Sequence, residues 1–227
     1  MIDIEREGPV FVLRMQDGEN RLNGPFVEAL NGALDEVERA EGEAALVTVG
    51  DGRFYSTGLD LEWLASGQSA RDLMANVHKL FARVLTFPMA TVAAINGHAF
   101  AAGAMLAVAH DFRVMRVDKG YVCLPEVDLG TGLPLTPGMH ALLDARLPRA
   151  VVHEALVTGR RYNATESIER GLVTIARPEG DVLPYAIEMA RALAGKHRAT
   201  LGAIKRGLFE SATEVLGRPI PDWLPDT

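Results

Sequence analysis

The sequence predicts an α/β protein built around a largely parallel sheet, and two observations support this prediction. Short apolar runs rich in β-branched residues recur along the chain, and turn residues and stretches with helical spacing separate them. The runs are also too uniformly apolar to have one face in water, which is typical of parallel strands covered by helices on both sides. We therefore expect right-handed crossovers between neighbouring strands.

The chain up to residue 117 contains the clearest elements. Residues 2–6 and 10–15 flank Gly8-Pro9 and predict a hairpin. From Pro25 to near Gly42 the apolar positions recur every three or four residues, which predicts a helix with proline in its first turn. The other predicted elements are a strand at 44–49, a short helix at 61–65, a helix at 69–85, a strand at 91–95, a helix at 101–109 and a strand at 112–117.

After Gly138 the pattern is dominated by helices. Apolar stripes predict helices at 150–157 and 182–193, and a single last helix over 201–215. The tail from Arg218 onward is rich in proline and is predicted to be irregular. The fold is therefore an α/β core followed by a helical region.

Composition and charge exclude several classes of protein. The chain has 227 residues, of which 48% are hydrophobic and 23% charged, so it is expected to fold rather than to be disordered. Its net charge of −7 opposes nucleic-acid binding, because phosphate backbones are bound by clustered lysine and arginine.

The expected location is the cytoplasm, with no membrane association. Cys123 is the only cysteine and cannot form an internal disulfide, and the N-terminal residues lack the pattern of a signal peptide. The uncharged stretch 89–109 is rich in alanine and is interrupted by the turn signal Asn96-Gly97, which favours a buried strand and helix over a membrane span.

Motifs for metal and serine chemistry fail on residue identity. His153-Glu154 is followed by Val157, where a zinc site would need a second histidine, so no metal is expected. Phe54 stands where the nucleophile turn of a serine hydrolase needs a glycine.

Three segments, 55–61, 96–104 and 124–130, carry the candidate site. The first two are loops of small residues that enter predicted helices, where free backbone N–H groups can receive an anionic oxygen. Two such helix ends facing each other could form an oxyanion hole. The alternative is that the small residues only permit close packing of the helices.

In this order, the three segments resemble the crotonase superfamily, the enoyl-CoA hydratase/isomerase family, over residues 44–171. Within it they look most like Δ3,Δ2-enoyl-CoA isomerases. The resemblance implies a spiral of β-β-α units with two roughly perpendicular sheets and a C-terminal helical region. We expect a spiral core at residues 1–171 and a helical trimerisation or lid region at 172–227. The resemblance also implies an acyl-CoA substrate, a homotrimer or dimer of trimers, and no cofactor, because coenzyme A is part of the substrate.

The resemblance assigns roles by position. Leu59 and Ala102 would supply the backbone N–H groups of the oxyanion hole, and Glu126 would be the catalytic residue. The first glutamate of the hydratases falls on Met105, and hydration needs a water held between two carboxylates, whereas a double-bond shift needs only one. The other residues expected to contact the substrate are Ser56, Gly58, Asp60, Leu61, Phe100, Met105 and Leu133.

The expected function is therefore isomerisation of 3-enoyl-CoA to 2-trans-enoyl-CoA in fatty-acid metabolism. Enoyl-CoA hydration or another crotonase reaction on an acyl-CoA thioester is the alternative. A third hypothesis is a catalytically silent acyl-CoA-binding protein.

Several of these residues have a structural alternative that the sequence leaves open. Glu126 could be a solvated loop carboxylate, Met105 a packing residue and Asp60 a helix N-cap. His98 is interpreted as a structural histidine with satisfied hydrogen bonds, and Asp128 as a structural carboxylate. The basic cluster could meet coenzyme A phosphates, although a solvated helical face is favoured; it comprises Lys196, His197, Arg198, Lys205 and Arg206.

Overall fold

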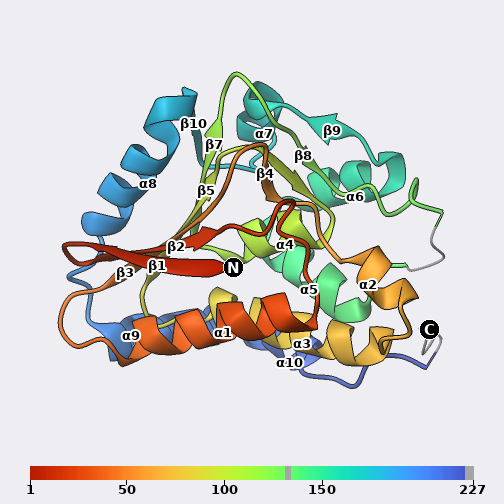
Figure 1. The fold of residues 1–227 in the computed structure, drawn as a ribbon, viewed down its shortest axis with the longest axis horizontal. Coiled ribbons are helices and arrows are strands. Elements are labelled where there is room, and N and C mark those ends of the chain that lie inside the picture. The colour runs from red at the N-terminus through yellow and green to blue at the C-terminus, as the bar shows by residue number, and fades with distance from the viewer. Residues whose placement is uncertain (131–133, 223–227) are drawn as a thin grey trace.

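The computed structural model describes residues 1–130 and 134–222 and contains two sheets surrounded by helices (Figure 1). The larger sheet begins with an antiparallel hairpin of β1 (Ile2–Glu7) and β2 (Val10–Met15), which confirms the predicted hairpin. Its strand order is β1-β2-β3-β5-β7-β10, and every pair after the hairpin is parallel. The added strands are β3 (Ala45–Gly50), β5 (Ala90–Ile95), β7 (Phe112–Arg116) and β10 (Ile175–Arg177).

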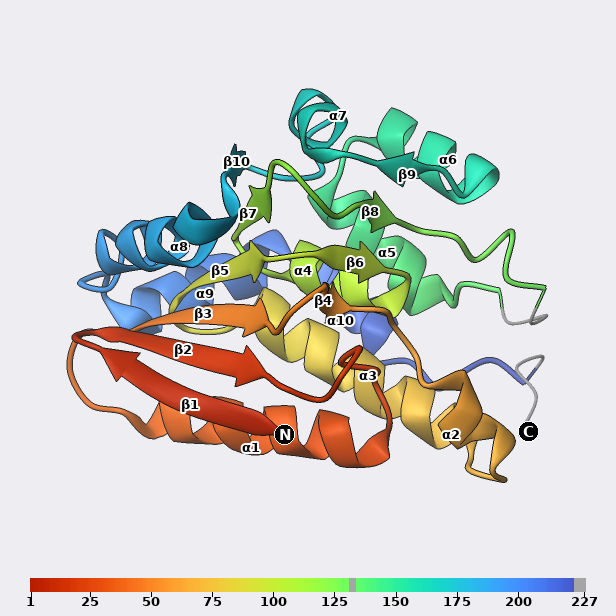
Figure 2. The same cartoon turned by 45° about the horizontal axis from the view of Figure 1, so that its top comes forward.

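The smaller sheet has the order β4-β6-β8-β9 and is parallel except for its last pair. Its strands are β4 (Phe54–Ser56), β6 (His98–Phe100), β8 (Val122–Cys123) and β9 (Arg161–Tyr162). The chain passes three times from the larger to the smaller sheet, through β3 to β4, β5 to β6 and β7 to β8, so it winds as a spiral (Figure 2). The predicted α/β spiral is confirmed.

Glycines bring successive turns of this spiral into backbone contact. A Cβ atom on Gly97 would lie 2.0 Å from the carbonyl oxygen of Arg53, and one on Gly120 would lie 2.7 Å from the carbonyl oxygen of Gly97. Because real side chains do not approach so closely, only glycine permits this stacking of one turn on the next.

Helices cover both faces of the larger sheet at its central strands, which explains why β3 and β5 are buried along their whole length. On one face α8 (Val182–Arg191) packs Ala186, Ile187 and Ala190 against alternate strand residues such as Val47 and Val92. The other face belongs to the main core, together with α1 (Gly24–Arg39), α3 (Ala70–Leu85) and α4 (Ala102–Ala109). A strand buried on both faces has no polar side to show in its sequence.

The remaining helices follow the spiral. They are α2 (Leu61–Ala65), α5 (Pro137–Arg146), α6 (Arg149–Thr158), α7 (Ala164–Glu169), a 3-10 turn at Glu179–Asp181, α9 (Arg198–Leu208) and α10 (Glu210–Leu216). The single last helix predicted over 201–215 is wrong, because the chain breaks it at Phe209 into α9 and α10.

The C-terminal part combines a strand with helices. β10 joins the larger sheet beside β7, and α10 contacts α5 and α3. The division of the chain at residue 171 into a core and a trimerisation or lid region stays a prediction.

Candidate active site

A cavity of about 150 Å³ lies where β4, β6 and β8 end. All three strands are parallel, so the loops that follow them meet at one edge of the smaller sheet. α3 and α5 supply the rest of the wall. The described lining residues are Thr57, Leu59, Leu61, Met74, Phe100, Ala101, Ala102, Pro125, Glu126, Leu129, Pro134, Leu135 and Met139.

The N–H of Leu59 is left free by the way its loop pairs with Leu22. Leu22 donates to the carbonyl of Gly58 (2.7 Å) and accepts from the N–H of Asp60 (3.1 Å). In a parallel bridge of this kind, the residue between the two bonded positions directs its own N–H and C=O away from the partner. Within the described chain no acceptor is bonded to the Leu59 N–H, which remains available to a ligand.

The N–H of Ala102 is free because Ala102 is the first residue of α4. Ala101 before it has φ = 50°, a conformation that side chains disfavour, and its N–H is bonded to the carbonyl of Cys123 (2.9 Å). Every residue of α4 is buried, so the positive end of the helix dipole acts in apolar surroundings. Gly103 permits this placement, since a Cβ atom there would lie 2.4 Å from the carbonyl oxygen of Ser56.

Gly58 brings these two N–H groups together. Its φ is +98°, and a Cβ atom on it would lie 3.1 Å from the nitrogen of Ala102 and 2.9 Å from the Cβ of Ala101. The residue before Leu59 therefore touches the start of α4, and both donors border one cavity. Two free N–H groups on one cavity are the kind of donors that can stabilise an oxyanion.

Glu126 supplies the carboxylate of the cavity. Its Oε2 atom is buried and has no hydrogen-bond partner among the described residues. Burial raises the pKa of Glu126 to about 7, although its own backbone N–H favours the charged form. Because Oε2 is buried, Glu126 is not a fully solvated loop carboxylate, and a carboxyl group with a pKa near neutrality can both accept and return a proton.

The other predicted site residues divide into two groups. Leu61 and Phe100 line the cavity, whereas Ser56, Asp60 and Met105 do not. Ser56 is fully buried and donates its hydroxyl to the carbonyl of Asn20 (2.7 Å), so it supports the loop from behind. Leu133 lies outside the described residues.

Asp60 and Met105 have the structural roles that the sequence offered as alternatives. Asp60 is the N-cap of α2, accepting from the N–H of Trp63 (3.0 Å). Burial raises its pKa, but hydrogen bonds from Asn23 and Trp63 and the charge of Arg21 outweigh this and lower the pKa overall. Met105 is fully buried in the core.

Two interpretations from the sequence need correction. His98 packs among the rings of Phe54, Phe100 and Tyr121, but its Nδ1 atom is buried and has no partner among the described residues, so it is not satisfied. Lys205 is not part of a solvated face, because it is 3% exposed and bonded to Asp111. Asp128 is exposed and lies against Gly159 at the end of α6.

Sequence reasoning missed the contribution of α3 and α5 and the role of Thr57. Met74 and Met139 reach the cavity from these two helices, and Thr57 lines it while donating its hydroxyl to Glu19 (3.1 Å). The N-cap signal Thr136-Pro137 could have located the start of α5, where Thr136 accepts from the N–H of Met139. The residues from α3 could be found only from its packing in three dimensions.

Two general features of the described chain bear on its chemistry. No group of three or more histidine, cysteine, aspartate or glutamate side chains in it could hold a metal ion. Among the helices of residues 1–130 and 134–222, none is long and apolar enough to cross a membrane.

A spiral fold that presents two free N–H groups and one carboxyl to a single cavity is the arrangement expected of an enzyme that stabilises an oxyanion during proton transfer. Comparison with known proteins identifies the family. The model of the enoyl-CoA hydratase/isomerase family matches residues 5–219, and the chain belongs to this family.

Some relatives within the family are named as isomerases and others as hydratases. Enoyl-CoA delta isomerase 3 of Arabidopsis thaliana is 32% identical, covering 86% of this chain and 86% of the relative. A putative enoyl-CoA hydratase of Thermus thermophilus is 36% identical, and the match covers 92% of this chain and 83% of the relative. The crystal structure of a probable enoyl-CoA hydratase from Mycobacterium tuberculosis superposes with a TM-score of 0.88 at 29% identity. The superposition covers 95% of this chain and 91% of that structure's chain.

Proposed function

We propose that this protein is a Δ3,Δ2-enoyl-CoA isomerase that converts 3-enoyl-CoA to 2-trans-enoyl-CoA. The observation that carries the proposal is that Glu126 is the only carboxyl group among the described residues lining the cavity. A double-bond shift needs one group that removes a proton and returns it, and one carboxyl can do both.

The proposed reaction has two steps. The Glu126 carboxylate removes a proton from the α carbon of the bound 3-enoyl thioester. The electrons of the broken C–H bond form a double bond between the α carbon and the carbonyl carbon, and the carbonyl π electrons move onto the thioester oxygen, which gives a dienolate. The N–H groups of Leu59 and Ala102 donate hydrogen bonds to that oxygen and so lower the energy of the charged intermediate. The protonated Glu126 then returns the proton to the γ carbon, which leaves the double bond conjugated with the carbonyl.

The surroundings of Glu126 suit this role. Apolar side chains such as Phe100, Met74 and Met139 border the cavity and keep water away from the dienolate. The same burial raises the pKa of Glu126 to about 7, which makes its carboxylate a stronger base towards the α proton than an ordinary glutamate, while both the charged and the protonated forms are populated near neutral pH.

Enoyl-CoA hydration is the second candidate, because relatives named as hydratases are about as similar to the chain as the isomerases are. Hydration needs a water molecule oriented by a second carboxylate. The position expected for it is Met105, whose fully buried thioether side chain cannot act as a base. The observation therefore favours isomerisation.

The test is to incubate the purified protein with 3-hexenoyl-CoA and with 2-trans-hexenoyl-CoA in separate reactions and to identify the products by mass spectrometry and chromatography. We expect conversion of the first to the conjugated thioester and negligible 3-hydroxyhexanoyl-CoA from the second. Rapid hydration would favour the second candidate, and binding of either thioester without turnover would favour a silent acyl-CoA-binding protein.

A matched pair of variants isolates the carboxyl group. Glu126→Gln should abolish isomerisation while thioester binding persists. Asp128→Asn, which changes an exposed carboxyl two residues away, should retain full activity. Equal rates in Glu126→Gln and wild type would refute the mechanism.

The assembly, setting and location of the protein are part of the same proposal. We infer a homotrimer or a dimer of trimers that takes part in fatty-acid metabolism in the cytoplasm and needs no added cofactor. Light scattering gives the subunit number, and dialysis against a chelator should leave the activity unchanged. Cell fractionation tests the location, which is of interest because two relatives of Arabidopsis thaliana are named as peroxisomal.

A further inference from the structure

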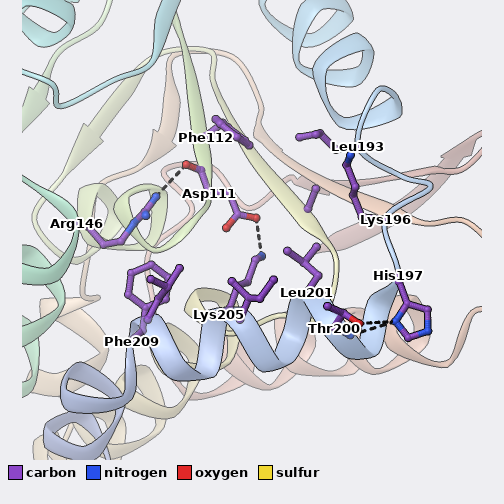
Figure 3. Close-up of a pocket in the computed structure, with 13 residues that line it drawn as sticks. Asp111, Phe112, Arg146, Leu193, Lys196, His197, Thr200, Leu201, Lys205 and Phe209 are labelled. Atoms are coloured by element: carbon purple, nitrogen blue, oxygen red, sulfur yellow. Dashed lines mark hydrogen bonds and ion pairs between the residues drawn. The ribbon is translucent and has the colours of Figure 1, made fainter.

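A second cavity, of about 530 Å³, lies between α9, the end of α5 and the N-terminal ends of β5 and β7 (Figure 3). The catalytic cavity lies at the opposite, C-terminal ends of its strands, and the two cavities share no described lining residue. We call this second cavity the α9 groove. Its volume falls within the range of small-molecule sites, which is roughly 300–1,000 Å³.

The walls of the α9 groove are apolar. α9 contributes Leu201, Ile204 and Leu208, Phe209 follows at its C-terminal end, and Phe112 and Leu193 lie across the groove from the helix. Ile204 is 53% exposed and Leu208 is 71% exposed, so hydrocarbon surface at the mouth of the groove faces solvent. Such surface is stabilised when an apolar molecule covers it.

The floor of the groove is polar and carries charged groups. The Lys205 ammonium donates to Asp111 (2.5 Å) and to the carbonyl of Met89 (2.7 Å). The Arg146 guanidinium donates to the carbonyls of His110 (2.7 Å) and Asp111 (2.9 Å). In Figure 3 the Arg146 and Lys205 side chains approach Asp111 from two sides.

This floor has more positive than negative charge. Arg113 lies beneath it, 6% exposed, and its described hydrogen bonds go to backbone carbonyls such as that of Leu172 (2.6 Å). Three cations thus share one carboxylate, that of Asp111, in the described structure around the floor. Burial lowers the pKa of Lys205, Arg146 and Arg113 although Asp111 opposes this, so one carboxylate does not fully compensate them.

Two donors on the floor are unused in the described chain. Nη1 of Arg146 makes no hydrogen bond there, and it is not among the buried atoms without a partner, so it keeps contact with solvent. The Lys205 ammonium has three N–H groups, and two of them have partners. An anion in the groove could accept hydrogen bonds from both side chains.

We propose that the α9 groove binds an alkyl carboxylate, a free fatty acid, with its hydrocarbon chain along the apolar wall and its carboxylate on Arg146 and Lys205. Guanidinium and ammonium groups form their strongest hydrogen bonds with carboxylates, and a carboxylate would offset the excess positive charge of the floor. The hydrocarbon chain would cover Ile204 and Leu208. This site is independent of the reaction that Glu126 performs.

The experiment is titration calorimetry of decanoate into the whole protein, with octanoyl-CoA present at saturation so that the catalytic cavity is occupied. We expect one decanoate to bind per chain. Decanol, which has the chain without the charge, and acetate, which has the charge without the chain, should each bind at least about tenfold more weakly. Equal affinity of decanol, decanoate binding that occurs only when octanoyl-CoA is left out, or no binding at millimolar decanoate would each overturn the proposal.

A matched pair of variants locates the binding. Ile204→Glu places a negative charge at the mouth of the groove and should weaken decanoate binding at least about tenfold. Ile168→Glu makes the same change at an exposed isoleucine on α7, outside the groove, and should bind decanoate as the wild type does. Circular dichroism of both variants checks that they fold.

Two outcomes with these variants would refute the proposal. Unchanged decanoate binding by Ile204→Glu would place the ligand elsewhere. A smaller assembly of Ile204→Glu in light scattering, together with absence of decanoate binding to wild type, would identify the groove as a contact between copies of the chain.

Discussion

Replacing Glu126 by glutamine should stabilise the protein at alkaline pH while it removes activity. The pKa of Glu126 is raised by burial from its ordinary value of 4.5 to about 7, so the folded state resists ionisation of this carboxyl. Below pH 4.5 the carboxyl is neutral in both the folded and the unfolded chain. As the pH rises towards 7 the unfolded chain loses the proton first, and the free energy of unfolding of the wild type falls.

The magnitude follows from the two pKa values. Their difference corresponds to about 3 kcal/mol once both states are ionised, at pH 8, and to less than about 1 kcal/mol at pH 5. Glu126→Gln cannot ionise and avoids this cost. Its advantage over the wild type in free energy of unfolding should therefore grow by about 2.5 kcal/mol between pH 5 and pH 8.

Urea denaturation of both proteins at pH 5 and pH 8, followed by circular dichroism, measures this change. The glutamine amide lies in the same apolar cavity at both pH values. The change in the advantage of Glu126→Gln between pH 5 and pH 8 therefore reports only the ionisation of the Glu126 carboxyl. Glu28→Gln serves as the control, since Glu28 is exposed and forms no ion pair or hydrogen bond in the described structure. An advantage of Glu126→Gln that is equal at pH 5 and pH 8 would refute the assignment of a buried, uncompensated carboxyl.

Three other outcomes are expected. The kcat/KM of isomerisation should fall about tenfold per pH unit below about 7, where Glu126 holds its proton, and a rate independent of pH between 5 and 7 would contradict its role as base. Gly58→Ala should lower kcat about 100-fold, because the added methyl would displace Ala101 and the donor of Ala102, and circular dichroism checks that the fold persists. Lys205→Met should lower the free energy of unfolding by about 3 kcal/mol, because it leaves the partly buried Asp111 without its ion pair. Lys196 is exposed, so Lys196→Met should change the free energy of unfolding by less than about 0.5 kcal/mol.

The long elements of the fold could be predicted from the sequence because each carries its own pattern. The hairpin of β1 and β2 and the helices α1 and α3 have a period that local spacing displays. The strands of the smaller sheet have only two or three residues, too few to show a period, and their pairing joins segments distant in the sequence. β10 was missed for the same reason.

The loops of the candidate site could be located because their sequence signals are local. Small residues before a helix indicate free N–H groups, and Glu126 follows a strand in a segment typical of the family. The side chains that complete the cavity could not be predicted, since Met74 and Met139 reach it through helix packing. The burial of Lys205 could not be predicted because other basic residues lie close to it in the sequence, and the group is typical of a solvated helix face. Its ion-pair partner, Asp111, is distant in the chain, so only the folded structure identifies Lys205 as buried.

The strained backbone of Ala101 has a consequence for the timing of catalysis. A residue other than glycine at φ = 50° costs on the order of 1–3 kcal/mol, and here the bond from its N–H to Cys123 and the burial of α4 offset that cost when the chain folds. In the proposed mechanism the N–H of Ala102 is thus preorganised before a thioester arrives, and the loop would have no rearrangement to make when negative charge develops on the oxygen. Solvent dipoles around a thioester in water must reorient at every reaction event, whereas under this mechanism the protein would complete the equivalent reorientation once, during folding.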